Sequence, residues 1–348
     1  MAAAEAVEHH DRRPAPGRHR AVGLDQRRVD ADAVVHRQRH LSGPREPRDG
    51  ESDAQRAGEQ EEPSHEVHSV TRRYDRLVDS RPVGVFDSGV GGLTVLHECL
   101  VTMPHEDFVY LGDHARLPYG PRPLDEVRRF AREIGAYLQD QGVKLVVNAC
   151  NTATSAALPQ LQEELAVPVV GVITPEAHAA VQATRNRRIG LLATEGTVEA
   201  GRYRELVHAL DAGVELFQVA CPRLVPLIES DDPFAGETTE AVREYAAPLK
   251  EAGVDTIILG CTHYPLIRPI FQRVFGRDVT LVFSAEETAR EVAQTLARKG
   301  YENDPEREGS YRFLTTGDPE AFREMGARFL QLPIAEVERV ELAALAAA

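Results

Sequence analysis

From residue 82 onward, short apolar segments alternate with longer segments whose apolar positions recur at helical spacing. The short segments are rich in Val, Ile and Leu, as expected for strands that helices cover on both faces. This alternation predicts an α/β fold with mainly parallel sheets. The predicted strands are Val83–Phe86, Phe108–Leu111, Leu145–Asn148, Val169–Ile173, Ile189–Ala193, Glu215–Val219, Thr256–Leu259 and Thr280–Phe283. The predicted helices include Leu124–Gln141, Ala156–Leu165, Val198–Leu210 and Glu237–Glu251.

An internal repeat relates two parts of this pattern. Residues 132–152 and 243–263 align without a gap at an offset of 111 residues, and seven of the 21 aligned positions are identical. Each copy predicts a helix, a Gly turn, a buried strand and then a cysteine, which is Cys150 in the first copy and Cys261 in the second. The repeat therefore predicts two pseudo-symmetric lobes, each with one cysteine at the same structural position.

The positions of the cysteines suggest where a ligand binds. We expect the first lobe to comprise residues 82–172 and 286–334, and the second lobe to comprise residues 173–285. Open α/β sheets bind ligands at the carboxyl ends of their strands, which is where both cysteines lie. Two lobes that face each other would place both thiols in one cleft. Because the chain crosses between the lobes twice, a hinge at the crossings could open and close that cleft.

The first 80 residues have a different composition. They contain 14 Arg, no Lys, 16 acidic residues, seven of the 13 His and one aromatic residue, Tyr74. With so few periodic apolar positions, the segment cannot bury enough surface to offset the entropy lost on ordering. We expect a disordered leader that results from a mis-assigned start, with the natural start between Val70 and Val83. A basic interaction arm and a histidine-rich metal tract are the alternatives, weakened by the acidic residues and the scattered histidines.

Charge and cysteine usage narrow the class of protein. The chain has 348 residues and a formal net charge of −15, which repels phosphate backbones and anionic lipids and argues against nucleic-acid or membrane partners. No apolar stretch approaches the roughly 18–20 residues that span a bilayer, and no signal-peptide pattern begins the chain. The four cysteines fit neither a zinc site nor a disulfide scaffold. We therefore expect a cytoplasmic protein with reduced thiols and no bound metal.

Cys150 and Cys261 are candidate functional residues. A cysteine between a buried strand and a helix start lies near free backbone N–H groups and the positive helix end, which are expected to lower its pKa. The alternative is that both are ordinary buried thiols, but their equivalence in the repeat favours function. Cys99 and Cys221 lack this context, and we expect them to be structural. The polar residues that follow the two candidates, and that suit a small zwitterion, are Asn151, Thr152, Thr262 and His263.

Two facing thiols suit the inversion of a carbon centre. Inversion requires a base on one face of the carbon and an acid on the other. A thiol can serve in either role once its pKa lies near the working pH. Thiol–disulfide chemistry is the alternative use of two cysteines, although it usually involves closely spaced or exposed pairs.

Five segments resemble the signature segments of the glutamate racemase family. They are PVGVFDSGVGGLTVL (Pro82–Leu96), YLGDHARLPYG (Tyr110–Gly120), NACNTATSAAL (Asn148–Leu158), GVITP (Gly171–Pro175) and LGCTHYPLI (Leu259–Ile267). The resemblance runs from about Pro82 to about Leu332. The two cysteine segments also suit the wider aspartate/glutamate racemase superfamily, whereas the first two segments favour its glutamate branch. The resemblance implies a cofactor-independent enzyme that converts L-glutamate to D-glutamate for peptidoglycan synthesis, and it suggests a homodimer.

The resemblance also assigns roles to single residues. Cys150 would remove the α-proton from D-glutamate, with Asp87 assisting. Cys261 would remove it from L-glutamate, assisted by His263 and Glu229. The residues that it implies in substrate binding are Asp87, Ser88, Tyr119, Gly120, Asn151, Thr152, Thr194, Thr197, Thr262 and His263.

Several of these residues also have simpler explanations. The Gly-rich segment Ser88–Gly92 is similar to a phosphate loop but lacks its Lys, so we expect a tight strand-to-helix turn instead. His263 could be an ordinary core histidine and Glu229 a solvated loop acid. Asp113 could position the Pro118–Gly120 loop without touching substrate.

Two other functions remain open from the sequence. A racemase for aspartate or a hydantoin would use the same paired thiols. A protein that only binds glutamate, or that inhibits another protein, belongs to a different class. A pure binder needs neither thiol, so the presence of both favours catalysis.

Overall fold

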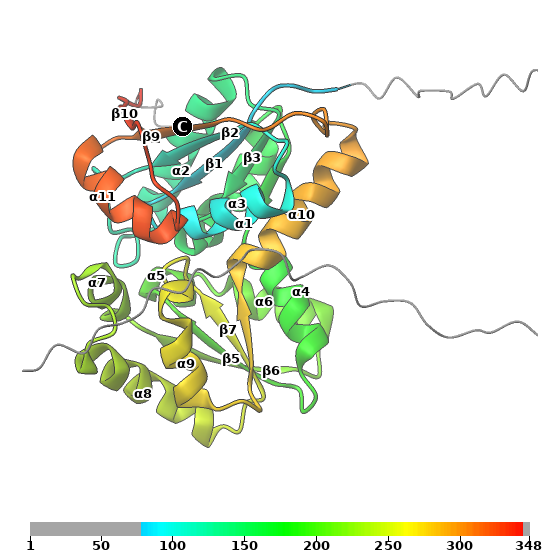
Figure 1. The fold of residues 1–348 in the computed structure, drawn as a ribbon. Helices are drawn as coiled ribbons and strands as arrows, with labels where there is room; N and C mark the ends of the chain where they lie inside the picture. The colour runs from blue at the N-terminus through cyan, green and yellow to red at the C-terminus, as the bar shows by residue number, and fades with distance from the viewer. Residues whose placement is uncertain (1–77, 344–348) are drawn as a thin grey trace, which may run out of the picture. The chain divides into compact units, whose positions relative to one another are not determined.

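The computed structural model describes residues 78–343, and all of them belong to one compact unit. The predicted leader lies outside the described residues, apart from residues 78–80. The described residues form two lobes, each built on its own parallel sheet, and Figure 1 shows the first lobe above the second. The α/β class predicted from the alternation of apolar segments is confirmed.

The first sheet has the strand order β10-β9-β2-β1-β3-β4, and every neighbouring pair is parallel. Its strands are β1 (Val83–Asp87), β2 (Phe108–Gly112), β3 (Leu145–Asn148), β4 (Val169–Gly171), β9 (Tyr311–Thr315) and β10 (Glu338–Arg339). The helices of this lobe are α1 (Leu93–Thr102), α2 (Leu124–Asp140), α3 (Asn151–Glu164), α10 (Ser284–Lys299) and α11 (Pro319–Leu330). The sequence did not predict β9 and β10, whose exposed residues break the apolar pattern, and β10 lies beyond the expected boundary at residue 334.

Side chains of β1 alternate between two apolar cores, one on each face of the first sheet. Val83 and Val85 belong to the core that also contains Leu93 of α1. Phe86 belongs to the core that contains Ile134 of α2. The continuous apolar sequence of this strand is explained by burial on both faces.

The second sheet has the strand order β6-β5-β7-β8, again with parallel pairs. Its strands are β5 (Arg188–Ala193), β6 (Glu215–Ala220), β7 (Thr256–Gly260) and β8 (Thr280–Phe283). The helices are α4 (Ile173–Ala183), α5 (Glu195–Glu199), α6 (Arg202–Leu210), α7 (Leu224–Glu229), α8 (Gly236–Glu251) and α9 (Arg268–Phe275), with a 3-10 helix, η1, at Tyr264–Ile267. The single helix predicted over 198–210 is wrong, because Gly201 adopts a φ of 69° between α5 and α6.

The 111-residue repeat corresponds to a repeated arrangement in space. The order β2-β1-β3-β4 in the first sheet matches β6-β5-β7-β8 in the second. The repeat aligns α2 and β3 of the first lobe with α8 and β7 of the second. Cys150 and Cys261 therefore follow equivalent strands of the two sheets.

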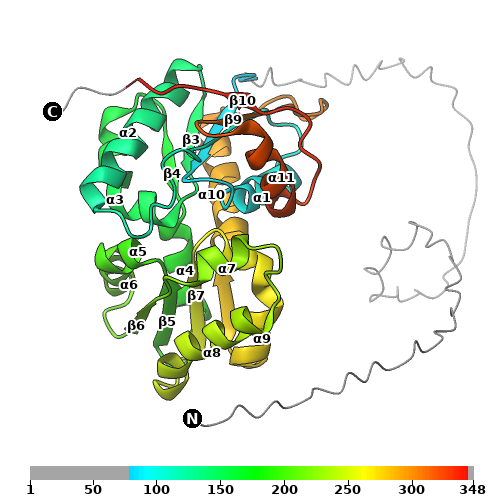
Figure 2. The ribbon, with the colours of Figure 1, turned by 90° about the vertical axis from the view of Figure 1, so that its left-hand side faces the viewer.

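The chain passes between the sheets where β4 leads into α4 and where β8 leads into α10. Helix α10 starts directly after β8 of the second sheet and packs against α1 of the first lobe and against α4 (Figures 1 and 2). Within residues 78–343, no helix is long and apolar enough to cross a membrane.

Candidate active site

A cavity of about 480 Å³ lies between the two lobes, at the carboxyl ends of strands from both sheets. Cys150 and Cys261 both line it, so the structure places the two thiols in one cleft. The predicted site residues that line it are Ser88, Tyr119, Gly120, Cys150, Asn151, Thr152, Thr194, Glu229, Cys261, Thr262 and His263. Asp87 and Thr197, which were also predicted, are fully buried and are not part of its lining.

Cys150 lies between β3 and α3. Helix α3 begins at Asn151, earlier than the predicted Ala156, and the Cys150 Sγ accepts a hydrogen bond of 3.4 Å from the backbone N–H of Ala153. The predicted lowering of its pKa is wrong. Burial raises the pKa of Cys150 to about 12, the negative charge of Asp87 adds to the rise, and the Ala153 N–H offsets only part of it. Cys150 is therefore a protonated thiol at neutral pH.

Asp87 ends β1, the strand that pairs with β3 in the sheet, so its carboxylate lies beside the Cys150 loop. One carboxylate oxygen, Oδ2, accepts a hydrogen bond of 2.9 Å from the Gly89 N–H. The other oxygen, Oδ1, is buried and has no hydrogen-bond partner among the described residues. Burial raises the pKa of Asp87, although the positive charge of His263 and the backbone N–H groups of the loop oppose this rise.

Cys261 has a different set of neighbours. A 3-10 helix follows it rather than an α-helix, so the capping geometry of Cys150 is not repeated. Its Sγ lies 3.8 Å from Nδ1 of His263, whose Nε2 lies 2.9 Å from Oε1 of Glu229. Glu229 is at the end of α7 and is only partly exposed. The thiol, the imidazole and the carboxylate thus form a chain along which a proton can move.

The charge state of His263 follows from its neighbours. Burial alone would lower the pKa of His263, but its interactions with Cys261 and Glu229 outweigh burial and raise the pKa to about 10. Burial would raise the pKa of Glu229, yet the hydrogen bond and the positive charge of His263 hold it below its usual value. At neutral pH these causes favour an imidazolium beside an ionised carboxylate.

The loop between β1 and α1 contacts the second lobe at this point. A Cβ added at Gly91 would lie 2.4 Å from Nδ1 of His263 and 2.4 Å from Oγ1 of Thr262, so only glycine fits there. The Thr94 hydroxyl lies 3.0 Å from the Gly91 carbonyl oxygen and 2.9 Å from that of Thr262. The turn predicted over this segment therefore also joins the first lobe to the loop that carries Cys261.

A second loop of the first lobe forms another wall of the cavity. Asp113 is fully buried and accepts hydrogen bonds from the Arg116 guanidinium, at 2.6 Å, and from the Tyr119 hydroxyl. Its other oxygen accepts a bond of 2.7 Å from the Thr316 hydroxyl. Asp113 thus fixes the loop that presents Tyr119 and Gly120, and it is not part of the cavity lining.

Three threonine hydroxyls meet across the cleft. Oγ1 of Thr152 on α3 lies 2.9 Å from Oγ1 of Thr194, which lies 2.9 Å from Oγ1 of Thr197. Nearby, the N–H of Gly196 donates to the carbonyl oxygen of Gly120 at 2.8 Å. Thr152 and Thr194 face the cavity, whereas Thr197 supports them from behind.

Some residues that line the cavity were not predicted from the sequence. Cys221 was expected to be structural, but it follows β6 and lines the cavity. Glu195 and Pro222 also line the cavity. The signal that could have found Cys221 is its place at the carboxyl end of a strand, the same signal that singled out Cys150 and Cys261.

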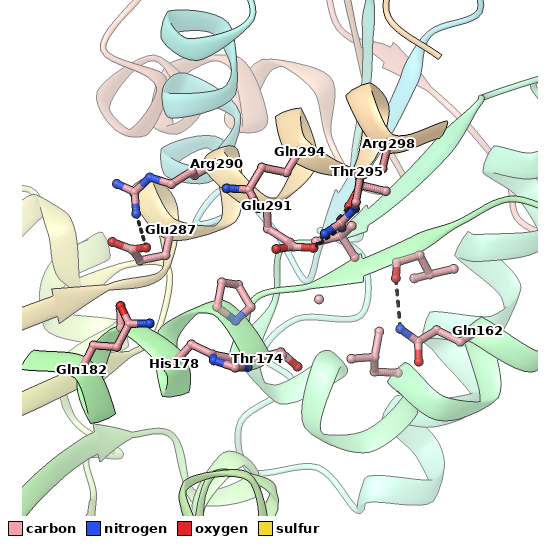
Figure 3. Close-up of a pocket in the computed structure, with 16 residues that line it drawn as sticks. Gln162, Thr174, His178, Gln182, Glu287, Arg290, Glu291, Gln294, Thr295 and Arg298 are labelled. Carbon is pink, nitrogen blue, oxygen red and sulfur yellow. Dashed lines mark hydrogen bonds and ion pairs between the residues drawn. The ribbon is translucent and has the colours of Figure 1, made fainter. Parts of the chain in front are cut away.

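A second, larger cavity of about 560 Å³ lies between α10 and the segment from β4 to α4 (Figure 3). Its charged residues pair with one another, Arg290 with Glu287 and Arg298 with Glu291. Its lining has no cysteine, and its one histidine is His178. Because its two carboxylates are held in ion pairs and its lining has no thiol, the smaller cavity with the two thiols is the candidate active site.

Comparisons with known proteins identify the family of this chain. The model of the Asp/Glu/Hydantoin racemase family matches residues 93–292. The chain belongs to this family. Among its relatives in the family, the glutamate racemase of Carnobacterium sp. (strain St2) is 44% identical over 262 residues, which cover 75% of this chain and 98% of the relative.

Solved structures of the family are also similar. The glutamate racemase isoform RacE1 of Bacillus anthracis matches with a TM-score of 0.73 and 40% identity, over 76% of this chain and 98% of that chain. The glutamate racemase of Francisella tularensis in complex with D-glutamate matches with a TM-score of 0.71 and 32% identity, over 76% of this chain and 98% of that chain. The racemase family predicted from the motifs is therefore confirmed.

Proposed function

We propose that this racemase-family chain interconverts L- and D-glutamate with Cys150 and Cys261 as its two acid–base groups and with no cofactor. The observation that carries the proposal is the presence of both thiols in one cavity, each on a different lobe and each beside its own proton-exchanging group. Because the thiols follow equivalent strands of facing lobes, they can approach opposite faces of one carbon.

In the L-to-D direction, Cys261 acts first as the base. Its thiolate takes the α-proton of L-glutamate, and the electron pair of the broken bond stays on the α-carbon and delocalises into the α-carboxylate. Cys150, a protonated thiol, then gives its proton to the opposite face of the carbon. The product is D-glutamate, and the sites end with Cys261 protonated and Cys150 as the thiolate.

The reverse direction needs the opposite protonation states. Because burial raises the pKa of Cys150, this thiol requires help to lose its proton. The unpartnered Oδ1 of Asp87 supplies a proton acceptor on the same lobe. In the L-to-D direction, by contrast, His263 carries the assisting charge: its imidazolium, with Glu229 behind it, faces the Cys261 thiolate that acts as the base.

The polar groups of the cavity suit a small zwitterion with two carboxylates. Ser88, Tyr119 and Gly120 line the cavity, as do Thr152 and Thr194, whose hydroxyls lie 2.9 Å apart. Thr262 lies next to Cys261. We assign these residues to the substrate carboxylates, which hold the α-carbon between the thiols.

Purified protein, with no added cofactor, should convert L-glutamate to an equal mixture of both enantiomers. The circular dichroism signal of the glutamate should therefore fall to zero. In heavy water, early product should be almost fully deuterated at the α-carbon while recovered substrate keeps its proton, because each face is served by a separate thiol. Cys150→Ser and Cys261→Ser should each lose about 10²–10⁴ in rate, the usual contribution of a positioned acid or base. Cys99→Ser, a change of a buried thiol in α1, is the matched control and should keep its activity.

Two results would refute the two-thiol mechanism. One is product that retains its original α-proton in heavy water, as expected for a single base that returns its own proton. The other is near-normal racemisation by both cysteine variants. A panel of aspartate, glutamate and a hydantoin separates the proposed substrate from those of other family members.

We also propose that the reaction takes place in the cytoplasm. All four cysteines are free, which suits the reducing cytoplasm where D-glutamate would enter peptidoglycan synthesis. The homodimer suggested by the resemblance stays a prediction, and analytical ultracentrifugation would test it.

A further inference from the structure

A buried polar cluster lies behind the cavity and outside the mechanism described above. The side-chain Nδ2 of Asn151 donates to Oε2 of Glu176 at 2.9 Å and to the Tyr203 hydroxyl oxygen at 2.8 Å. The Tyr203 hydroxyl in turn donates to the same Glu176 oxygen. Glu176 and Tyr203 are fully buried, and Asn151 is 3% exposed. Each hydrogen of the Asn151 amide nitrogen therefore has an acceptor in this cluster.

This cluster connects both cysteine loops. Asn151 follows Cys150 and starts α3 of the first lobe, whereas Glu176 is on α4 and Tyr203 is on α6 of the second lobe. A Cβ added at Gly260, the residue before Cys261, would lie 3.2 Å from the Tyr203 hydroxyl oxygen. The cluster thus lies directly behind the residues that carry both thiols.

Two oxygens of the cluster, Asn151 Oδ1 and Glu176 Oε1, have no partner among the described residues, and of these two residues only Asn151 reaches the cavity. Asn151 lines the cavity, and its Oδ1 is buried without a hydrogen bond. A buried acceptor without a donor is costly, by an amount comparable to a lost hydrogen bond. A ligand with a cationic donor would satisfy it, and the α-ammonium of an amino acid is such a donor.

Glu176 determines which end of the Asn151 amide is available for this contact. Because Oε2 of Glu176 accepts a hydrogen bond from the Asn151 amide nitrogen, that nitrogen must face Glu176. The amide oxygen must therefore face away from it. If Glu176 were absent, the Tyr203 hydroxyl could donate to Oδ1 instead and turn the amide around. The amide nitrogen would then face the substrate and repel its α-ammonium.

We propose that Glu176 is a positioning residue that orients the Asn151 side chain so that its Oδ1 binds the α-ammonium group of the substrate. This assignment rests on the proposed racemisation of glutamate. It gives a role to a carboxyl group that no step of the proton transfer uses.

The test compares Glu176→Leu with Glu176→Gln in the full chain. Glu176→Leu removes the acceptor and should raise KM for both enantiomers by about tenfold or more, the loss expected for a hydrogen bond to a charged group, with a smaller change in kcat. Glu176→Gln keeps a carbonyl acceptor and should restore most of the loss. Gln182→Leu places the same side chain at an exposed position of α4 and is the matched control, with KM close to that of the wild type.

A substrate analogue separates positioning from a general structural effect. Glutarate keeps two carboxylates at the spacing of glutamate but has no α-ammonium. Its inhibition constant should therefore change less than about twofold in Glu176→Leu, although the KM for glutamate rises. Replacing Tyr203 by Phe in the Glu176→Leu background removes the donor that turns the amide around, and it should lower KM again.

Two outcomes would overturn the inference. One is a folded Glu176→Leu variant whose KM is within about twofold of the wild-type value. The other is an equal weakening of glutamate and glutarate. If the leucine variant does not fold, Glu176→Ser gives the same comparison, because it also removes the carboxyl acceptor. Absence of racemisation by the wild-type chain would instead refute the proposed function, so the two failures are distinguishable.

Discussion

His263 Nε2 lies 2.9 Å from Glu229 Oε1, which places a carboxylate of α7 on the far side of the imidazole from Cys261. This contact helps to raise the pKa of His263 from 6.5 to about 10 against the opposing effect of burial. Because the folded-state pKa is raised, the imidazolium contributes stability that is fully present below pH 6.5 and is lost as the pH rises through about 10. In the folded protein His263 is therefore a cation at pH values below about 10.

Glu229→Gln should therefore shift the alkaline limb of the pH–rate profile, where activity falls as the pH rises, to lower pH. The carboxylate is an opposite charge beside His263, so its removal should lower the apparent pKa of that limb by roughly one to three units. The measurement is kcat/KM for L-glutamate from pH 6 to 10.5. Asp231→Asn removes one negative charge at an exposed position two residues away and should leave the limb in place. An unchanged limb in Glu229→Gln would show that this carboxylate does not control His263.

Gly91→Ala should reduce activity because the new Cβ would occupy the place of the imidazole. It would lie 2.4 Å from His263 Nδ1, so the ring must leave the position in which this nitrogen lies 3.8 Å from the Cys261 Sγ. Gly89→Ala is the control in the same loop, because its Cβ would meet only Leu117 at 3.4 Å, an ordinary contact. We expect at least a tenfold loss of kcat for Gly91→Ala, on the order of a misplaced acid–base group, and a small change for Gly89→Ala. Equal activity of the two variants would contradict the packing described for this loop.

Asp87→Asn and His263→Asn should act on different directions of the reaction. Under single-turnover conditions, Asp87→Asn should slow D-to-L conversion more, because Asp87 is placed to serve Cys150. His263→Asn should slow L-to-D conversion more, because His263 contacts Cys261. Steady-state measurements cannot show this difference, because the ratio of kcat/KM for the two directions equals the equilibrium constant. Mirror symmetry of the two enantiomers fixes that constant at one. If each variant slowed both directions equally, the assignment of Asp87 to Cys150 and of His263 to Cys261 would be wrong.

Elimination from a β-substituted analogue should reveal the face that each thiol serves. Removal of the α-proton and loss of chloride from 3-chloroglutamate need only one base and release HCl, and water then converts the resulting enamine to 2-oxoglutarate and ammonia. Cys261→Ser should process the D-analogue through Cys150, and Cys150→Ser should process the L-analogue through Cys261. Formation of 2-oxoglutarate by each variant from each enantiomer provides the measurement. The same handedness in both variants would mean that the thiols do not lie on opposite faces.

The sequence predicted the strands that position the site because burial on both faces leaves a clear apolar signature. All eight strands expected from that pattern are present, with ends that differ by at most two residues. Strands β9 and β10, at one end of the first sheet, lacked this signature, because their exposed positions carry polar residues and tyrosine. Gly201 is the reason that one predicted helix is two, since a single left-handed residue is not visible in apolar periodicity.

The sequence by itself determined the α/β class, the repeat and the two cysteines that follow equivalent strands. These features depend on local patterns: apolar periodicity, turn residues, and a 111-residue offset that keeps Cys150 and Cys261 in register. Only the tertiary structure decided the protonation of Cys150, because burial and the nearby charge of Asp87 together outweigh the helix-start effect that the sequence suggested. It likewise decided that Asn151 meets Glu176 and that His263 meets Glu229, because contacts between residues 25 and 34 positions apart depend on how the elements pack.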